Sequence, residues 1–266
     1  MSWRRLLPAA VLGPLLLWAA AQEPVPAYVL GVGLCALIGS GELYLLLARA
    51  GYRPLWLLGV PLAVGLALST LGGASAWHPH LLAGATFGGL AWAAFRHPRR
   101  DALLDWAVTL APALYVGGLL AYYPLLRALP HGGYWVPVVL GCTWAADIAA
   151  YFVGRRWGQT KLAPTLSPGK SAEGAVGGLA GAVALAAVVA VVAPPPALSP
   201  LVLLGLGALV AIAGLIGDLA ESFIKRQLGA KDASGLLLGH GGLLDRMDSL
   251  LAAGMVAYLY LLAIGR

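Results

Sequence analysis

Long apolar runs recur along the whole chain, and they are the feature that most restricts its possible folds. A helix of about 20 apolar residues can cross the hydrocarbon core of a bilayer. The runs are continuous stretches of Leu, Ala, Val and Gly, unlike the alternating segments of about ten residues that build a membrane β-barrel. Only 11% of the residues are charged. The predicted fold class is therefore an all-α, polytopic integral membrane protein.

We predict about nine transmembrane helices, separated by breaks rich in proline, glycine and charge. The expected spans are residues 6–21, 27–47, 54–72, 80–95, 102–125, 134–153, 175–193, 198–224 and 249–264. About five of them form an N-terminal transmembrane region, residues 1–132, and the remainder a C-terminal catalytic region, residues 133–266. The first span also has the form of a cleaved signal peptide, although we expect it to be retained as a helix.

The distribution of basic residues supports this topology. If the chain crosses the membrane at every span, only Arg127 and Arg266 of its 17 lysines and arginines lie on the side opposite the N-terminus. Because cytoplasmic loops carry the excess of Lys and Arg, we expect the N-terminus inside and the C-terminus outside. The net charge of +6 is then explained by topology and by anionic headgroups, without a nucleic acid partner.

Four glycines near the start of the span 175–193 are spaced for helix packing. Gly174 and Gly178 form one G-x-x-x-G pair, and Gly177 and Gly181 form a second that overlaps it. Such pairs let two membrane helices approach closely. We therefore predict close packing of this helix against a neighbour.

Polar residues collect in three patches that this topology places at the cytoplasmic surface. In the first patch, Asp147 and Tyr151 are one turn apart and share a helix face. An aspartate inside a membrane helix is costly, and it normally faces a polar cavity that contains a partner. The second patch is the loop 158–174, whose lysines, hydroxyls and backbone N–H groups could meet phosphate. Its Gly-Lys-Ser triplet lacks the rest of a P-loop frame.

The third patch begins at the end of the span 198–224. Asp218, Glu221, Ser222 and Lys225 are spaced as one polar stripe on a helix. The other polar or glycine positions of this patch are Arg226, Lys231, Asp232, His240, Gly241, Gly242, Asp245, Arg246 and Asp248. Asp245 and Asp248 can face one way because they are three residues apart.

This cluster suits the chemistry of phosphate transfer. Carboxylates with few histidines favour magnesium, and lysines and arginines favour phosphate oxygens. Together they fit phosphoryl or nucleotidyl transfer assisted by a divalent ion. The alternative is internal pairing, such as Asp218 with Lys225 or Asp245 with Arg226. That alternative explains single residues better than the whole cluster.

The spacing of the third patch resembles the signature of phosphatidate cytidylyltransferases, also called CDP-diacylglycerol synthases. The resemblance rests on Ser222 to Arg226, Lys231-Asp232 and His240 to Asp248, with the first two patches in agreement. It covers roughly residues 141–250. Leu238 stands where the family commonly has proline, and Gly169 where it commonly has lysine. The second departure removes one cation from the loop.

The resemblance implies that CTP and phosphatidic acid give CDP-diacylglycerol and pyrophosphate, with Mg²⁺ required and a second, monovalent cation an open question. It also implies a homodimer in the inner (plasma) membrane, with the active site facing the cytoplasm. For the metal we expect Asp218 and Asp245 first, then Asp248 and Asp147, with Asp218, Asp245, Lys225 and Arg226 as the catalytic set. The expected substrate contacts are Ser167, Lys170, Ser222, Lys225, Arg226, Lys231, His240, Gly241, Gly242 and Arg246. The expected supporting residues are Tyr151, Glu173, Glu221 and Asp232.

Two other classes of function remain as alternatives. A CTP-dependent polyprenol or dolichol-type lipid kinase would use the same nucleotide in the same membrane setting. An ion-coupled transporter would also carry acidic residues in its helices, but it predicts an internal repeat and acids near mid-membrane. In this sequence no repeat relates the two halves, and the acids gather toward one face.

Overall fold

The computed structural model describes residues 26–71, 77–96, 101–195, 198–234 and 241–265. Its elements are α2 (Pro26–Arg49), α3 (Trp56–Leu68), α4 (Trp77–Arg96), α5 (Ala102–Pro112), the π-helix η2 (Ala113–Gly118), α6 (Tyr122–Ala128), α7 (Gly132–Trp157), β1 (Lys161–Ala163), β2 (Ser167–Ser171), α8 (Ala172–Val192), α9 (Pro200–Gln227) and α10 (Leu244–Ala263). Every predicted span after the first falls on one or more of these helices. The span 6–21 lies outside the described residues.

The helices form a membrane-type bundle. In the described residues six are long and apolar enough to cross a bilayer, with α5, η2 and α6 taken as one. The helix α3 has 13 residues, which is short for a crossing. The all-α expectation is thus confirmed in its coarse form, whereas the count of nine crossings and the orientation of the termini stay predictions.

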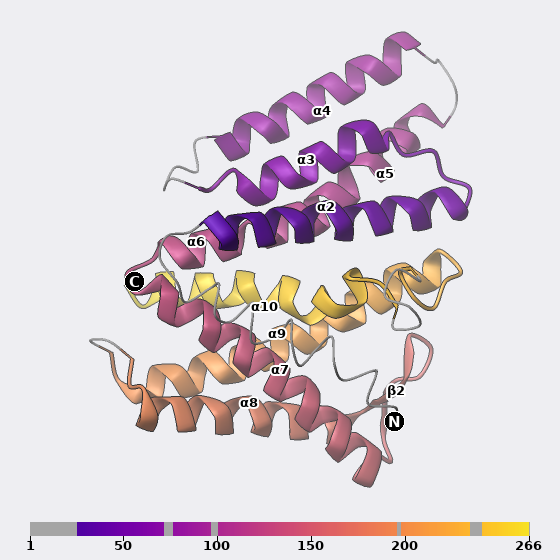
Figure 1. Cartoon of the computed structure of the whole chain (residues 1–266). Coiled ribbons are helices and arrows are strands. Elements are labelled where there is room, and N and C mark those ends of the chain that lie inside the picture. The colour runs from indigo at the N-terminus through magenta and orange to yellow at the C-terminus, as the bar shows by residue number, and fades with distance from the viewer. Residues whose placement is uncertain (1–25, 72–76, 97–100, 196–197, 235–240, 266) are drawn as a thin grey trace.

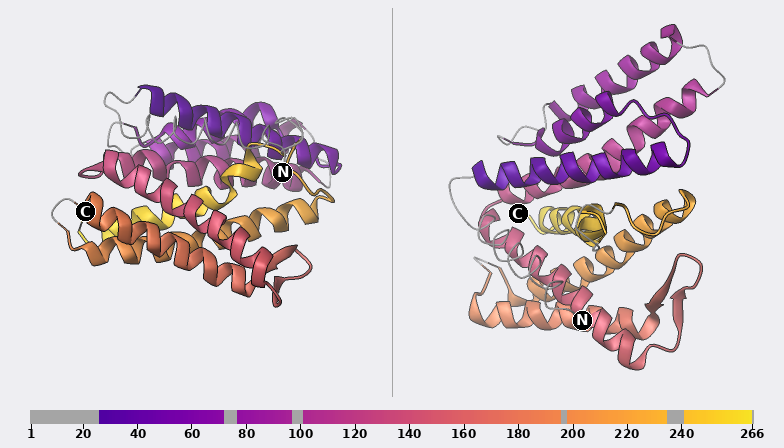
Figure 2. Two further views of the ribbon diagram at one scale, coloured as in Figure 1. Left: turned by 60° about the horizontal axis from the view of Figure 1, so that its bottom comes forward. Right: turned by 45° about the vertical axis from the view of Figure 1, so that its right-hand side comes forward.

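The helices divide into two groups (Figure 1). The helices α2 to α5 stack on one side, and α7 to α10 lie on the other, with α7 crossing the second group obliquely (Figures 1 and 2). The helix α10 packs against α9, and it also contacts α2, α6 and α7. The proposed boundary at residues 132 and 133 falls at the start of α7, and the larger hydrophobic cluster draws residues from both sides of it.

Local sequence explains where two of the C-terminal helices start. The Ser171 side chain caps α8 by accepting a hydrogen bond from the N–H of Gly174 at 3.1 Å. Ser199 caps α9 in the same way, with Pro200 at the first helical position. The helix α10 differs, because no side chain at its own N-cap position accepts from its first turn.

Two local features depart from the expected helices. The predicted span 102–125 is not one regular helix, because η2 widens it between α5 and α6. The bare Gly117 lets η2 lie against the backbone of Ala63 in α3. The predicted loop 158–174 contains an antiparallel hairpin of β1 and β2, in which Lys161 pairs with Ser171. The fold is therefore not purely helical.

Two hydrophobic clusters hold the bundle together. The larger cluster joins α2, α6, α7, α8, α9 and α10, with one residue each from α3 and η2, and the smaller one joins α3, α4 and η2. Trp135 and Leu206 are fully buried in the larger cluster. Many large apolar side chains are instead exposed, such as Phe95 and Val191, with 90% and 83% of their surface accessible. Exposed apolar surface of this extent fits contact with lipid.

The predicted close packing at the glycines of α8 is confirmed, with α7 as the neighbour. A methyl group at Gly177 would overlap the Val153 side chain. One at Gly181 would overlap the Ala149 side chain and approach the Ala145 carbonyl oxygen. Because these glycines have no side chain, the backbones of α7 and α8 can approach closely.

Gly181→Ala is expected to destabilise the protein by about 2 kcal/mol, because the added methyl group has to push α7 and α8 apart. Thermal unfolding in detergent measures the effect. Gly84→Ala is the matched control, because a methyl group there meets nothing within 4 Å. It should leave stability unchanged or raise it slightly. Equal behaviour of the two variants would contradict the packing argument.

Candidate functional site

The three polar patches meet where α7, the hairpin, α9 and α10 come together. Lys170 of β2 forms an ion pair with Asp218 of α9, which joins the second patch to the third. Ser249 of α10 lies 3.4 Å from Asp147 of α7, as a donor to its carboxylate, and this joins the first patch to the third. Asp248 lies within electrostatic range of both Asp147 and Asp218.

The first group of polar side chains is accessible, and we call it the open group: Asp147, Asp218, Asp248 and Lys170. Asp147 is exposed, and the side chains of Asp218 and Lys170 keep 29% and 20% of their surface accessible. This group has three carboxylates and one ammonium, that of Lys170 on Asp218, so negative charge is in excess. A ligand that carries positive charge can reach this group and would be favoured there.

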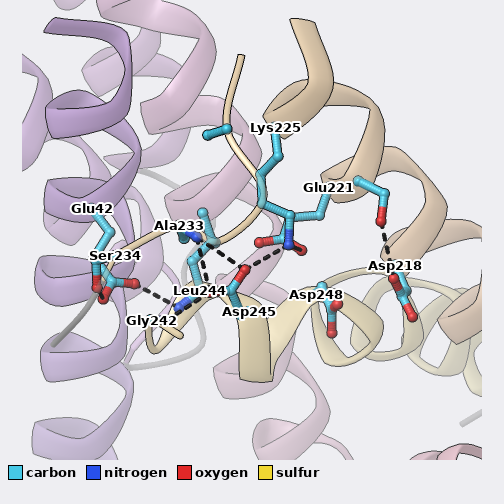
Figure 3. A network of polar contacts seen from close by, with 12 residues as sticks. Glu42, Asp218, Glu221, Lys225, Ala233, Ser234, Gly242, Leu244, Asp245 and Asp248 are labelled. Atoms are coloured by element: carbon cyan, nitrogen blue, oxygen red, sulfur yellow. Dashed lines mark hydrogen bonds and ion pairs between the residues drawn. The ribbon is translucent and has the colours of Figure 1, made fainter. Parts of the chain in front are cut away.

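The second group is closed, and we call it the buried triad: Glu221, Lys225 and Asp245. The Lys225 Nζ lies 2.6 Å from Glu221 Oε2 and 2.5 Å from Asp245 Oδ1 (Figure 3). Glu221 is 1% exposed, and the side chains of Lys225 and Asp245 are each 12% exposed. The triad therefore ties the end of α9 to the start of α10.

Backbone amides complete the surroundings of Asp245. Its Oδ2 accepts from the N–H of Gly242 at 2.6 Å and from that of Ala233 at 2.9 Å. Both oxygens are therefore occupied by donors in this arrangement. Asp245 therefore belongs to the buried triad, whereas Asp248 belongs to the open group.

The two ion pairs considered from the sequence, Asp218 with Lys225 and Asp245 with Arg226, do not form; both aspartates have other partners. Asp218 pairs with Lys170 and Asp245 pairs with Lys225. Arg226 lies elsewhere, because its guanidinium donates to the carbonyl oxygens of Leu166 and Ala230. The reason is tertiary: the hairpin brings its own lysine to Asp218, and the start of α10 brings Asp245 beside Lys225.

The open group has the chemistry for a divalent ion, since carboxylate oxygens are the ligands that Mg²⁺ prefers. Within the described ranges, however, no three carboxylate, His or Cys side chains converge closely enough to enclose a metal. The ammonium of Lys170 takes the place of a cation at Asp218. The residues thus fit a metal by type and by charge, with Lys170 as its competitor.

Among the other expected residues, Ser222 lies beside the open group and Glu173 lies at the hairpin. Ser222 donates to Asp218 at 3.4 Å. Glu173 accepts from the N–H groups of Gln159 and Thr160, and so holds the base of the hairpin. The Tyr151 hydroxyl accepts a hydrogen bond from Arg155 at 2.9 Å, and its side chain is half exposed. Ser167 is partly exposed, Lys231, Asp232 and Arg246 are exposed, and His240 lies outside the described residues.

The glycines of the third patch make room for carboxylates. Gly241 has a φ of +77°, which favours glycine, and a Cβ there would lie 2.5 Å from Asp245 Oδ2. A Cβ at Gly242 would lie 2.5 Å from the carboxylate of Glu42. Whether these glycines also approach substrate phosphate stays a prediction.

Two residues of the N-terminal half belong to the site and were missed from the sequence. Glu42 of α2 is 6% exposed and binds the start of α10. Tyr115 of η2 lies within electrostatic range of Glu221, Asp248 and Asp218. Its hydroxyl is buried and, like Oε1 of Glu221, has no hydrogen-bond partner in the part of the chain that the structure describes. The only sequence signal for Glu42 was its position as an acid within an apolar span.

The sequence of the chain is also similar to those of known proteins. The sequence model of the cytidylyltransferase family matches residues 3–264. The phosphatidate cytidylyltransferase of Pseudomonas aeruginosa is 55% identical over 129 residues, which are 48% of this chain and 48% of the relative. That of Brucella suis is 42% identical over 56% of this chain and 55% of the relative. That of Bacillus subtilis is 39% identical over 58% and 56%. The match spans about half the length of these curated relatives.

Proposed function

The chain belongs to the cytidylyltransferase family, and on this premise we propose that it transfers the cytidylyl group of CTP to phosphatidic acid. In this reaction a phosphate oxygen of the lipid attacks the α-phosphorus of CTP. The bond from the α-phosphorus to the bridging oxygen breaks, and pyrophosphate leaves. The products are CDP-diacylglycerol and pyrophosphate. The observation that carries the proposal is the open group, in which three membrane helices gather carboxylates around Lys170.

In this reaction the main task of the protein is to bring two anions, CTP and the lipid phosphate, together. Because the acceptor is already a phosphate anion, no strong general base is needed, and positioning with charge neutralisation does most of the work. We assign the divalent ion, Mg²⁺, to Asp218, and we propose that Asp147 and Asp248 would have to move closer to it to complete the site. When bound, it would neutralise phosphate charge. Asp245 is a further candidate ligand only if Lys225 moves away from it.

Cations near the open group are proposed to hold the substrate phosphates. With a metal bound at Asp218, Lys170 would be available to bind phosphate from the hairpin. Arg246 and Lys231 are exposed at the neighbouring helix end and loop. Arg226 is assigned a different part, because its bonds to Leu166 and Ala230 fix the hairpin beside α9.

The lipid substrate fits a membrane enzyme whose polar groups lie at one end of its helices. Exposed apolar side chains on the bundle are suited to acyl chains. We propose that this end faces the cytoplasm, where CTP is present, because the positively charged loops fall on that side. A homodimer in the inner (plasma) membrane is proposed on the family resemblance alone.

The direct test uses purified protein in detergent with CTP, phosphatidic acid and Mg²⁺. Label in the α-phosphate of CTP is expected to appear in the lipid, pyrophosphate is expected in equal amount, and EDTA is expected to stop both. Transfer of label from γ-labelled CTP alone would instead establish a lipid kinase. If no label reaches any lipid phosphate or polyprenol acceptor, the proposal is wrong and the transporter alternative is the next to test.

A further inference from the structure

Glu42 supplies the N-terminal cap that α10 lacks within its own sequence. Its Oε1 and Oε2 accept from the N–H groups of Leu243 at 3.0 Å and of Leu244 at 2.8 Å. Its Oε1 also accepts from the Ser234 hydroxyl at 2.5 Å. The first N–H groups of a helix have no partner inside the helix, and a carboxylate there is also favoured by the helix dipole. The cap comes from α2, 201 residues away from Leu243.

Glu42 and Asp245 bind neighbouring residues of the same segment. Ala233 donates to Asp245, and the next residue, Ser234, donates to Glu42. On the far side of residues 235–240, Gly242 donates to Asp245 and the next residue, Leu243, donates to Glu42. Figure 3 shows the two carboxylates on either side of these donors. Each end of the segment is therefore held by both carboxylates.

The contact leaves no space for a side chain at Gly242. A Cβ there would lie 2.5 to 2.7 Å from three atoms of the Glu42 carboxylate. The burial of Glu42, at 6% exposure, means that water cannot readily replace the lost bonds if the carboxylate is changed. A displacement of the Glu42 carboxylate would therefore displace Gly242, whose N–H group is bonded to Asp245.

We propose that Glu42 is a positioning residue for the catalytic site, acting through Asp245. It holds the start of α10 so that Asp245 stays on Lys225 and on the backbone amides of Ala233 and Gly242. This inference rests on the proposed cytidylyl transfer, because it assigns Glu42 to the same site. The N-terminal half then contributes to the reaction in addition to anchoring the protein in the membrane.

Glu42→Gln keeps the size of the side chain and replaces one acceptor oxygen by an NH₂ group, which faces N–H donors. We expect this variant to lower the rate of CDP-diacylglycerol synthesis by about 100-fold, as small misplacements of catalytic groups do. In a protein that already carries Asp245→Asn, the same change should alter the residual rate by no more than about threefold, because the residue that it acts through is already lost. Radiolabelled CTP makes the low residual rates measurable.

Ser199→Ala is the matched control, since it removes the cap of α9 at the end of that helix away from Asp218. Its effect should be small and equal in both backgrounds. A Glu42→Gln effect of equal size with and without Asp245→Asn would overturn the inference, as would a wild-type rate in the single variant.

Amide hydrogen exchange separates this inference from the proposed function. Glu42→Gln should speed exchange at Gly242, Leu243 and Leu244 by at least about tenfold, whether or not the protein makes CDP-diacylglycerol. Unchanged exchange would overturn the inference even in an active enzyme. An inactive wild type with faster exchange in the variant would instead overturn the proposed function alone. If Glu42→Gln does not fold, Ser234→Ala removes one donor and takes its place, with the same outcomes.

Discussion

Asp218→Asn is expected to lower the rate of CDP-diacylglycerol synthesis by about a thousandfold while the protein stays folded in detergent. The amide is the same size as the carboxylate, but it is neutral. It would weaken the bond to Lys170 and remove a carboxylate from the group to which we assign Mg²⁺. Because the Asp218 side chain is 29% exposed, little stability depends on its charge. Steady-state rates over a range of Mg²⁺ concentrations, with thermal unfolding of the same samples, measure both effects.

Asp105→Asn is the matched control for this variant. It makes the same chemical change in the first turn of α5, outside both polar groups. It should keep the wild-type rate within about twofold, as changes away from special features usually do. If Asp218→Asn retains a near-normal rate, the assignment of the metal is wrong.

Lys225→Met is expected to cost about 3 to 5 kcal/mol of stability, because removing one partner of a buried ion pair leaves an uncompensated charge. Two carboxylates would lose their ammonium here. Glu221 is only 1% exposed, so water cannot replace its lost bond to Lys225. Its Oε1 already has no hydrogen-bond partner among the described residues. Asp245 would keep only its two backbone donors. Thermal and denaturant unfolding in detergent measure the loss.

Two further variants make this prediction specific. Lys161→Met removes an exposed lysine of the hairpin, and it should change stability by less than about 0.5 kcal/mol. Adding Glu221→Gln to Lys225→Met should recover part of the lost stability, because it removes one of the two unpaired charges. A Lys225→Met protein as stable as the Lys161→Met control would show that the buried triad does not hold α9 to α10.

Some of the site could be predicted because its signals lie within short segments. The polar stripe from Asp218 to Lys225 follows from helical spacing. The close packing of α8 at its glycines follows from helical spacing as well. The partners of those residues could not be predicted in this way. Lys170 reaches Asp218 only because β1 and β2 form a hairpin, a structure that the Gly- and Pro-rich loop did not reveal.

The division between the open group and the buried triad also depended on tertiary packing. From their spacing alone, Asp245 and Asp248 are two acids three residues apart that can face the same way. In the structure, Asp245 faces Lys225 and two backbone amides, whereas Asp248 is near Asp147 and Asp218. Helical spacing states which residues share a face, but it does not state which neighbour covers each part of that face.

The sequence by itself determined that this chain is a helical membrane protein and which family it resembles. Hydropathy and motif spacing are properties of short segments, so they can be read without knowing how the segments pack. Only the tertiary structure brought Glu42 to the start of α10 and Tyr115 to the acidic residues of α9 and α10. Contacts between residues 201 positions apart depend on the packing of whole helices, and no local pattern encodes them.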